Sequence, residues 1–331
     1  MNTKIISRRK VLIGGVLSFM SALSFGQSRV EGSGKTVKII IGFPPGQATD
    51  SVTRLVADKL RGVTGNNYIV DNKPGQGGSI ALGQVAKAPA DGSVMSVVHM
   101  SAIAANPHLY PSVPYDSLKD FEPVGLIGDL PFVLVCNPSL PFKTLKELIA
   151  YAKANPDTLT NASSGNGTVS HLAMEKLKRD AGIKITHVPY KGSVAGLTDV
   201  MSGNVSIALE TASSVRPHIE SGKLRALAIG SSKQLGGVFA GVPTLRELGF
   251  KDINAVTWLM IIYPAGTPKT IVNSTYSALS TVMSNPDTEQ SLLAMGCIPR
   301  VSKGPEDAMA YLRNEYKYWG DVVKASGVKL E

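Results

Sequence analysis

The 331-residue sequence is poor in the groups that carry out covalent chemistry. It has no G-x-S-x-G motif, and Ser170 and His171 are sequence neighbours, which does not make a nucleophile and its base. No two carboxylates stand out as an acid–base couple. Only His171 and Glu175, four positions apart, have a spacing suited to a metal, and we interpret that pair as capping or pocket lining. The sequence therefore predicts neither a catalytic residue nor a metal site.

Nucleotide-binding motifs are missing as well. No G-x-x-x-x-G-K-[ST] loop occurs in the sequence. The stretch from Gly165 to Ser170 is a near miss to G-x-G-x-x-G, because Ser170 stands where the third glycine should be. No acidic partner for a ribose is evident on the second strand. We therefore expect no nucleotide and no other cofactor.

Cysteine is scarce. Cys136 and Cys297 are far apart in the sequence, and each has apolar neighbours. A bridge between them is possible in an oxidising compartment, but we interpret both as buried free thiols. The sequence alone leaves the pairing open.

The positive charge is small once the N-terminal segment is set aside. Four of the 34 basic residues lie in that segment, which leaves 30 against 25 acidic residues, or +5. These charges are spread along the chain and form no basic cluster. The balance therefore argues against a nucleic-acid partner and slightly favours anionic solutes.

Residues 1–26 have the pattern of a signal peptide. A basic start is followed by an apolar stretch from Val11 to Phe25, and the small residues Ser24 and Gly26 suit a signal peptidase. The stretch is shorter than the roughly 20 residues of a membrane span, so we expect cleavage near Gly26. Ser7 to Leu12 loosely resembles a twin-arginine signal, and both that route and the general secretory route stay open. No cysteine lies near the cleavage region, so we expect a periplasmic protein without a lipid anchor.

Beyond the leader, short apolar runs alternate with helical patterns. Strands are predicted over 37–43, 68–71 and 94–99, with amphipathic helices between them, which indicates βαβ units and largely parallel sheets. Two extended apolar segments, Val124 to Cys136 and Ala255 to Tyr263, lack helical spacing and would serve as crossings between two lobes. We expect the first lobe to comprise 35–126 and 258–331, and the second 127–257.

One strand–turn–helix pattern occurs twice. Gly42 to Asp50 follows an apolar run, and Ser163 to His171 follows another. Such a turn directs backbone N–H groups and the positive end of a helix dipole at one spot, where an anion can bind. Ordinary βα connections also carry Gly and Pro, but two turns with Ser, Thr or Asn beside a helix start favour ligand contact. Val188 to Ser193 forms a third polar loop, where Tyr190 and Lys191 are either pocket-lining or structural.

A set of stretches, in this order, is specific to one family. They are Gly42 to Asp50, Asn72 to Gly78, Asn106 to Tyr110, Pro114 to Phe121, Ala162 to Ala173, His187 to Gly192, Gly222 to Ala228, Val242 to Thr244 and Pro264 to Pro268. From about residue 36 to 331, the chain resembles the periplasmic solute receptors of tripartite tricarboxylate transporters, the Bug/TctC type.

The resemblance implies an α/β, two-lobed "Venus flytrap" fold of the type II periplasmic-binding class, in which each lobe is a mainly parallel sheet flanked by helices. It also implies a ligand carboxylate held by the two turns. The implied ligand-binding residues are Phe43, Pro45, Gly46, Gln47, Ala48, Thr49, Asp50, Ser101, Ala102, Ser163, Ser164, Gly165, Asn166, Gly167, Thr168, His171, Tyr190 and Glu210. Gln47 stands where the family usually has a second glycine, and Glu210 stands where an Asp is common.

The residue patterns predict a non-enzymatic, exported receptor that captures a small carboxylate, and the resemblance implies that it delivers this ligand to a tripartite tricarboxylate transporter permease. We expect a monomer with a membrane permease as partner and no nucleic acid. The alternative is an enzyme on a flytrap scaffold that acts on a small carboxylate. The sensing part of a transcription regulator is a third class, but it would need an N-terminal DNA-binding helix pair where this chain has a leader. The sequence leaves the carboxylate unidentified, and transport or signalling open as its role.

Overall fold

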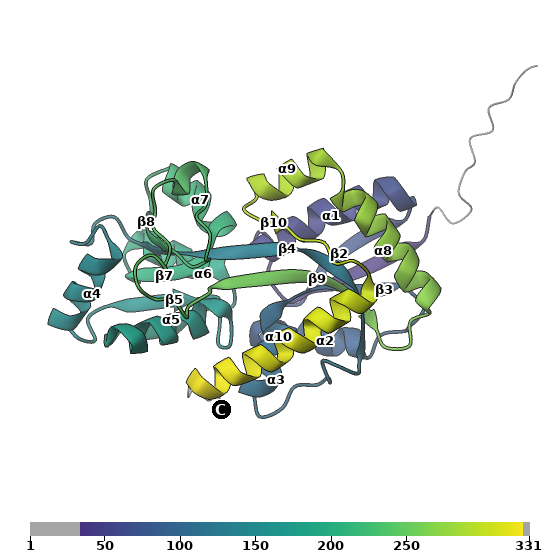
Figure 1. The fold of residues 1–331 in the computed structure, drawn as a ribbon, viewed down its shortest axis with the longest axis horizontal. Helices are drawn as coiled ribbons and strands as arrows, with labels where there is room; N and C mark the ends of the chain where they lie inside the picture. The colour runs from purple at the N-terminus through teal and green to yellow at the C-terminus, as the bar shows by residue number, and fades with distance from the viewer. Residues whose placement is uncertain (1–33, 327–331) are drawn as a thin grey trace, which may run out of the picture. The chain divides into compact units, whose positions relative to one another are not determined.

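This computed structural model describes residues 34–326. Their strands form one ten-stranded sheet (Figure 1). The strand order is β2-β1-β3-β9-β4-β7-β5-β6, with β10 and β8 each paired to β4. The predicted signal peptide over 1–26 lies outside the described residues. Among the described residues, no helix is long and apolar enough to cross a membrane.

The first section of the sheet contains β1 (Thr36–Ile41), β2 (Asn67–Asn72), β3 (Val94–His99) and β9 (Val256–Pro264). β1 pairs in parallel with β2 and β3, whereas β9 is antiparallel to β3. The short β10 (Ile298–Pro299) pairs with β4. The three strands that the sequence predicts in this part of the chain are therefore confirmed.

The second section contains β5 (Thr160–Ser163), β6 (Thr186–Pro189), β7 (Ile207–Thr211) and β8 (Arg225–Ile229). β5 is parallel to β6 and β7, while β7 and β8 are antiparallel to β4.

The two sections share β4 (Phe121–Cys136), whose first part pairs with β9 and whose last five residues pair with β7 and β8. The sheets are therefore mixed where β4 and β9 lie, and parallel on either side. The long apolar runs of these strands agree with burial on both faces. The lobe boundaries expected near 126 and 257 stay a prediction.

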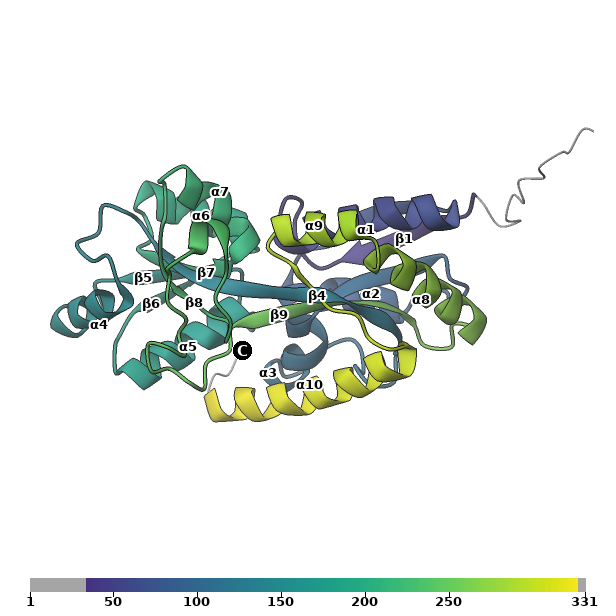
Figure 2. The ribbon, with the colours of Figure 1, turned by 45° about the horizontal axis from the view of Figure 1, so that its top comes forward.

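Helices cover both faces of the sheet. They are α1 (Ala48–Thr64), α2 (Ser79–Ala86), α3 (Asn106–Leu109), α4 (Leu145–Ala154), α5 (Val169–Ala181), α6 (Ser193–Ser202), α7 (Ala212–Glu220), α8 (Lys269–Met283), α9 (Pro286–Ala294) and α10 (Pro305–Ser326). Short helical turns occupy Gln76–Gly78, Ser101–Ala105 and Gly237–Phe239. Figure 2 shows α1, α8 and α9 along one face of the central strands, and α3 and α10 along the other.

Side-chain alternation in the central strands fills the core on both faces. Val97 and Ile261 pack with α1 and α8, and their strand neighbours Val98 and Met260 pack on the opposite face with α2 and α10. This is the period of two that a β-strand imposes on its side chains. The helix α10 packs against the second of these layers, where its Leu312 is fully buried.

Both cysteines are free and buried, as the sequence interpretation has it. Cys136 lies at the end of β4, and Cys297 lies between α9 and β10. Burial raises the pKa of the Cys136 thiol to about 11 and that of Cys297 to about 12. Neither thiol is therefore ionised near neutral pH.

Candidate functional site

A cavity of about 240 Å³ opens where strands of both sections end. From the first section it is lined by Gly42, Phe43, Gly75, Gln76, Gly77 and Tyr110, and from the second by Ser164, Gly165, Asn166, Pro189, Tyr190 and Lys191. These residues follow β1, β2, β5 and β6 or the short α3. The cavity thus lies at the carboxyl ends of parallel strands, where α/β sheets bind their ligands.

The first predicted turn, Gly42 to Asp50, is fixed by a buried carboxylate. Asp50 Oδ2 accepts hydrogen bonds from the Gly46 amide and Arg54 Nε, both at 3.0 Å, and Oδ1 accepts one from Asn72 Nδ2 at 2.9 Å. Burial would raise the pKa of Asp50, but these hydrogen bonds outweigh it and hold the pKa below its usual range. Asp50 therefore shapes the turn, and its oxygens are already occupied by partners from the protein.

The helix start behind this turn is uncapped. Gln47 is the N-cap residue of α1, yet its side chain makes no capping hydrogen bond, and its buried Oε1 has no partner among the described residues. Ala48 and Thr49 begin the helix and are buried, whereas Pro45 and Gly46 are exposed. A side-chain carbon on Gly192 would lie 2.8 Å from Gln47 Oε1, so the third loop approaches this turn closely. The first-turn amides of α1 thus lack a side-chain cap, as an anion site requires.

The second turn differs from the expectation of unpaired amides. The Ser164 amide donates to Ser170 Oγ at 2.9 Å, that of Gly165 to Ser163 Oγ at 3.2 Å, and that of Gly167 to His171 Nδ1 at 3.2 Å. Short polar side chains turn back to the backbone here, which is their common behaviour in loops. The Asn166 amide makes no hydrogen bond within the described chain, and the N-cap Thr168 does not cap α5. Fewer amides are therefore free than the sequence suggests.

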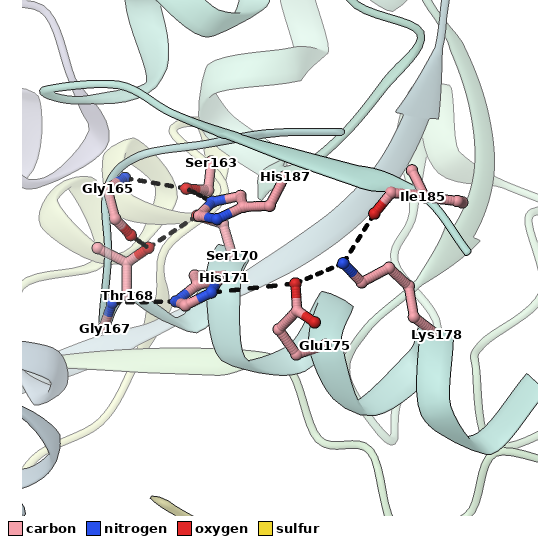
Figure 3. Close-up of polar contacts among 10 residues, drawn as sticks. All are labelled: Ser163, Gly165, Gly167, Thr168, Ser170, His171, Glu175, Lys178, Ile185 and His187. Atoms are coloured by element: carbon pink, nitrogen blue, oxygen red, sulfur yellow. Dashed lines mark hydrogen bonds and ion pairs between the residues drawn. The ribbon is translucent and has the colours of Figure 1, made fainter. Parts of the chain in front are cut away.

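Two histidines support this turn from behind (Figure 3). His187 Nε2 lies 2.6 Å from Ser163 Oγ, and its ring stacks on that of His171 at a centroid distance of 4.1 Å. His187 lies in β6, 16 positions beyond His171, so sequence spacing gives no indication of this contact.

Three side chains near this turn could together hold a metal ion, namely His171, His187 and Glu175. Each offers one possible ligand atom, and these atoms lie within 4.8 Å of one another. In the structure these side chains have other partners. Glu175 Oε1 is 2.5 Å from Lys178 Nζ, and the two ring planes differ by only 11°. A histidine binds a metal ion with a lone pair that lies in the plane of its ring. Two stacked, nearly parallel rings cannot both have the same ion in their planes, so this arrangement is unfavourable for a shared metal site. We interpret the group as structural support of the second turn.

Glu210, at the end of β7, is a buried acid next to this turn. Its side chain is 2% exposed, and Oε1 accepts a hydrogen bond from the Ser164 hydroxyl at 2.6 Å. Oε2 has no hydrogen-bond partner among the described residues. Burial raises the pKa of Glu210 to about 7, with the Ser164 hydroxyl opposing the rise.

Two tyrosines and a lysine complete the walls of the cavity. The Tyr110 hydroxyl donates to the main-chain oxygen of Asn166 at 3.3 Å and so connects the two sections. The Tyr190 hydroxyl donates to Asp199 at 2.5 Å, which leaves its ring to line the cavity. Lys191 is the one charged side chain among the lining residues, and it is exposed. The lining therefore presents a positive charge and no negative one.

Ser101 and Ala102 are buried and are not among the residues that line the cavity. The Ser101 amide donates to Nδ1 of His99 at 3.2 Å, and the Ala102 carbonyl accepts a hydrogen bond from Tyr115. The His99 ring lies 4.2 Å from that of Phe43, and its Nε2 has no partner among the described residues. Burial lowers the pKa of His99 to about 3, so the ring is neutral.

The structure brings five of the predicted site residues onto the cavity wall, namely Phe43, Ser164, Gly165, Asn166 and Tyr190. The remaining thirteen lie in or behind the turns. Sequence reasoning did not include Gly75, Gln76, Gly77 and Tyr110 among the site residues, although all four line the cavity. The glycine-rich loop after β2 ends a parallel strand next to β1, and that position is the signal that could have found it.

Comparison with known proteins gives a consistent result. The family model described as "Tripartite tricarboxylate transporter family receptor" matches residues 52–328. Protein BugT of Bordetella pertussis is 35% identical over 298 residues, which cover 90% of this chain and 91% of BugT. The solved structure of R. palustris Rpa4515 with adipate has a TM-score of 0.85 and 31% identity, and covers 89% of this chain and 98% of that one. Periplasmic binding protein BugD has a TM-score of 0.84 and 30% identity, with 90% and 99% covered.

The matches extend over nearly the whole described chain, and the α/β arrangement of the two sheet sections agrees with them. The fold is that of the two-lobed, type II periplasmic-binding class. The relatives are named as receptors and binding proteins, so the alternative of an enzyme on the same scaffold finds no support. The chain therefore belongs to the tripartite tricarboxylate transporter receptor family and is a Bug-type solute-binding receptor, not an enzyme.

Proposed function

We propose that this receptor is exported to the periplasm, captures a small carboxylate between two lobes and delivers it to the permease of a tripartite tricarboxylate transporter. The lobes would comprise 35–126 with 258–331, and 127–257. The observation that carries the proposal is the cavity itself. Loops from both sheet sections line it, and Lys191 is the one charge on its wall.

The cavity suits a small anion in size and in chemistry. Its volume of about 240 Å³ is below the range of roughly 300–1,000 Å³ that is usual for drug-sized ligands. A hydrogen bond to a charged group contributes about 1.5–3 kcal/mol, and a helix terminus adds about 0.3–1 kcal/mol. Two or three such hydrogen bonds at each of two turns sum to roughly 6–18 kcal/mol, a range that includes the roughly 8 kcal/mol of micromolar binding and leaves a margin for ordering costs. The adipate in the related Rpa4515 structure supports a dicarboxylate or an acid of similar size.

We propose that the five predicted residues on the cavity wall contact the ligand directly, together with Gln76, Tyr110 and Lys191. The other predicted residues would act through the turns. They would shape the backbone and orient the free amides of Asn166 and of the first turn of α1.

Thermal unfolding of the leaderless protein against a panel of acids tests the ligand class. The panel contains C4–C6 dicarboxylates, citrate, acidic amino acids and aromatic acids, each at ~1 mM. A ligand at 100 times its dissociation constant stabilises the fold by about 2.7 kcal/mol and raises Tm by several degrees. A rise with one acid and none with its amide or ester supports the proposal. If no acid raises Tm and mass spectrometry of the denatured protein detects no bound carboxylate, the proposal is wrong.

Delivery to a permease and export need their own experiments. Cells that express the cognate permease should take up the identified acid only when this receptor is present. Processing near Gly26 is checked by N-terminal sequencing of the exported protein, and the expected monomer by light scattering. Uptake that is unchanged without the receptor would argue for a signalling role.

A further inference from the structure

Glu210 is an acid without a counter-ion. Its neighbours are the hydroxyls of Ser164 and Ser170 from the second turn and α5, the Thr211 amide from its own strand, and Val133 from β4. No lysine, arginine or histidine in the described chain forms an ion pair with it. A buried carboxylate in such surroundings is stabilised only by hydrogen-bond donors.

The contact with Glu210 sets the direction of the Ser164 hydroxyl. Ser164 Oγ donates its single proton to Glu210 Oε1 across 2.6 Å. A hydroxyl has one donor and two acceptor positions, so Ser164 can only accept from a group in the cavity. Ser164 lines that cavity, and Glu210 Oε2 behind it also lacks a donor. This wall of the cavity therefore presents acceptors, although the free amide of Asn166 beside it presents a donor.

We propose, on the basis of the function proposed above, that Glu210 determines which carboxylates the receptor accepts. With Glu210 ionised, the wall at Ser164 favours acids that carry a hydrogen-bond donor beside a carboxylate, namely hydroxy acids and amino acids. Plain dicarboxylates of the same length lack that donor, and a carboxylate placed against Ser164 meets only lone pairs. Glu210 thus acts through Ser164 as a specificity-determining residue.

Protonation of Glu210 reverses this preference. A proton on Oε1 makes Glu210 the donor to Ser164, and the Ser164 hydroxyl can then donate to a second carboxylate of the ligand. The pKa of about 7 places this change in the accessible pH range. A plain dicarboxylate should therefore take up a proton with it when it binds at neutral pH, whereas a hydroxy acid should not.

Matched pairs of acids test the proposal. We would measure the affinities of succinate against malate and aspartate, and of glutarate against glutamate, by calorimetry at pH 8 and pH 6. In whichever pair binds, the acid that carries the hydrogen-bond donor should have a dissociation constant roughly tenfold lower at pH 8 than its plain partner. This factor corresponds to one hydrogen bond of about 1.4 kcal/mol. The ratio should shrink at pH 6. Calorimetry at pH 7 in two buffers of different ionisation enthalpy should show proton uptake with the plain acid alone.

The variant Glu210→Gln makes the test specific. Its amide can donate to Ser164 at any pH, so the preference for a donor and its pH dependence should both disappear. Ser164→Ala should also abolish the preference, because it removes the hydroxyl that carries the effect. Glu247→Gln is the matched control. Glu247 is an exposed acid outside the cavity lining, and it accepts a hydrogen bond of 2.8 Å from the Thr244 amide. Its replacement should leave the preference between the matched acids, and the pH dependence of that preference, unchanged.

The outcomes separate this proposal from the one on which it rests. If Glu210→Gln binds each pair with the wild-type ratio at both pH values, Glu210 does not set specificity. If citrate or an aromatic acid binds and none of the matched acids does, the assigned ligand class is wrong while the receptor function stands. Absence of binding by every acid in the wider panel contradicts the proposed function itself.

Discussion

The imidazole rings of His171 and His187 lie face to face, 4.1 Å apart with planes 11° from parallel. One ring comes from α5 and the other from β6, and both bind the turn between Ser163 and Gly167. Burial lowers the pKa of each to about 4, and the charge of Lys178 adds to the effect in both. The second turn is thus supported by two neutral rings at neutral pH.

Acid should destabilise the protein through this pair. The unfolded chain takes up protons on its histidines near pH 6.5, whereas the folded pair does so only near pH 4. Stability that is present above pH 6.5 is therefore lost as the pH falls toward 4. A difference of this size corresponds to roughly 3 kcal/mol for the buried His171, and to less for His187, because that ring is partly exposed and solvent screens its charge. Urea unfolding at pH 7, 5.5 and 4.5 measures it.

A variant isolates the contribution of one ring. Glu210 works in the opposite direction, because a raised pKa of about 7 gives stability that is present below pH 4.5 and lost as the pH rises through 7. That contribution is common to the wild type and to His187→Gln, so it cancels in their comparison. The variant should lose less stability than the wild type between pH 7 and 4.5. An identical pH profile for the two proteins would contradict this account.

Tyr110→Phe should weaken ligand binding without unfolding the protein. The lost hydroxyl donates to the Asn166 carbonyl and connects the two sections across the cavity. One such hydrogen bond contributes about 0.5–1.5 kcal/mol, so the dissociation constant should rise roughly two- to tenfold. Tyr276→Phe is the control, because its hydroxyl also donates to a main-chain oxygen, that of Ser302, but away from the cavity. Equal affinities for the two variants would exclude this role for Tyr110.

The two strand–turn–helix units could be predicted because their signals are local. An apolar run that ends in Gly42, followed by helical spacing, is readable in any window of the sequence. The hydrogen-bond partners of the amides in the second turn could not be predicted from the sequence, because they depend on how β6 approaches α5. His187 reaches Ser163 only after β5 and β6 have paired. Tyr110 and the loop at Gly75 likewise reach the cavity through the tertiary fold.

The chemistry of Glu210 was the least predictable part of the site. The sequence shows an unusual acid at that position, but not whether a cation lies nearby. Its altered pKa comes from burial at the end of β7 and from the absence of any ion-pair partner in the described chain. Both are properties of the assembled sheet. Sequence patterns therefore indicate the loops that surround the cavity, and tertiary packing determines the charge behind them.

Asp50→Asn should loosen the first turn. The carboxylate accepts three hydrogen bonds, including those from the Gly46 amide and Arg54, and an amide cannot accept them all. Loss of hydrogen bonds to this buried charged group costs about 1.5–3 kcal/mol of unfolding free energy. Affinity should fall as well, because the turn directs the first amides of α1. Asp58→Asn is the control on the same helix, where the carboxylate is exposed and pairs with Arg61 at 3.6 Å. A stability loss as small as that of the control would show that Asp50 does not hold the turn.

Gly46→Ala should separate binding from stability. Gly46 has a φ of +82°, and a side-chain carbon there would meet no atom within 4 Å, so the substitution introduces backbone strain without a clash. Gly182, which ends α5 with a φ of +62° and equally open surroundings, provides a matched control. Each Ala should cost about 1–2 kcal/mol of unfolding free energy, measured in urea. Only Gly46→Ala should raise the dissociation constant, because strain there is relieved by shifting the turn that precedes the α1 amides. If both variants bind the ligand as tightly as the wild type, the first turn is not part of the binding site.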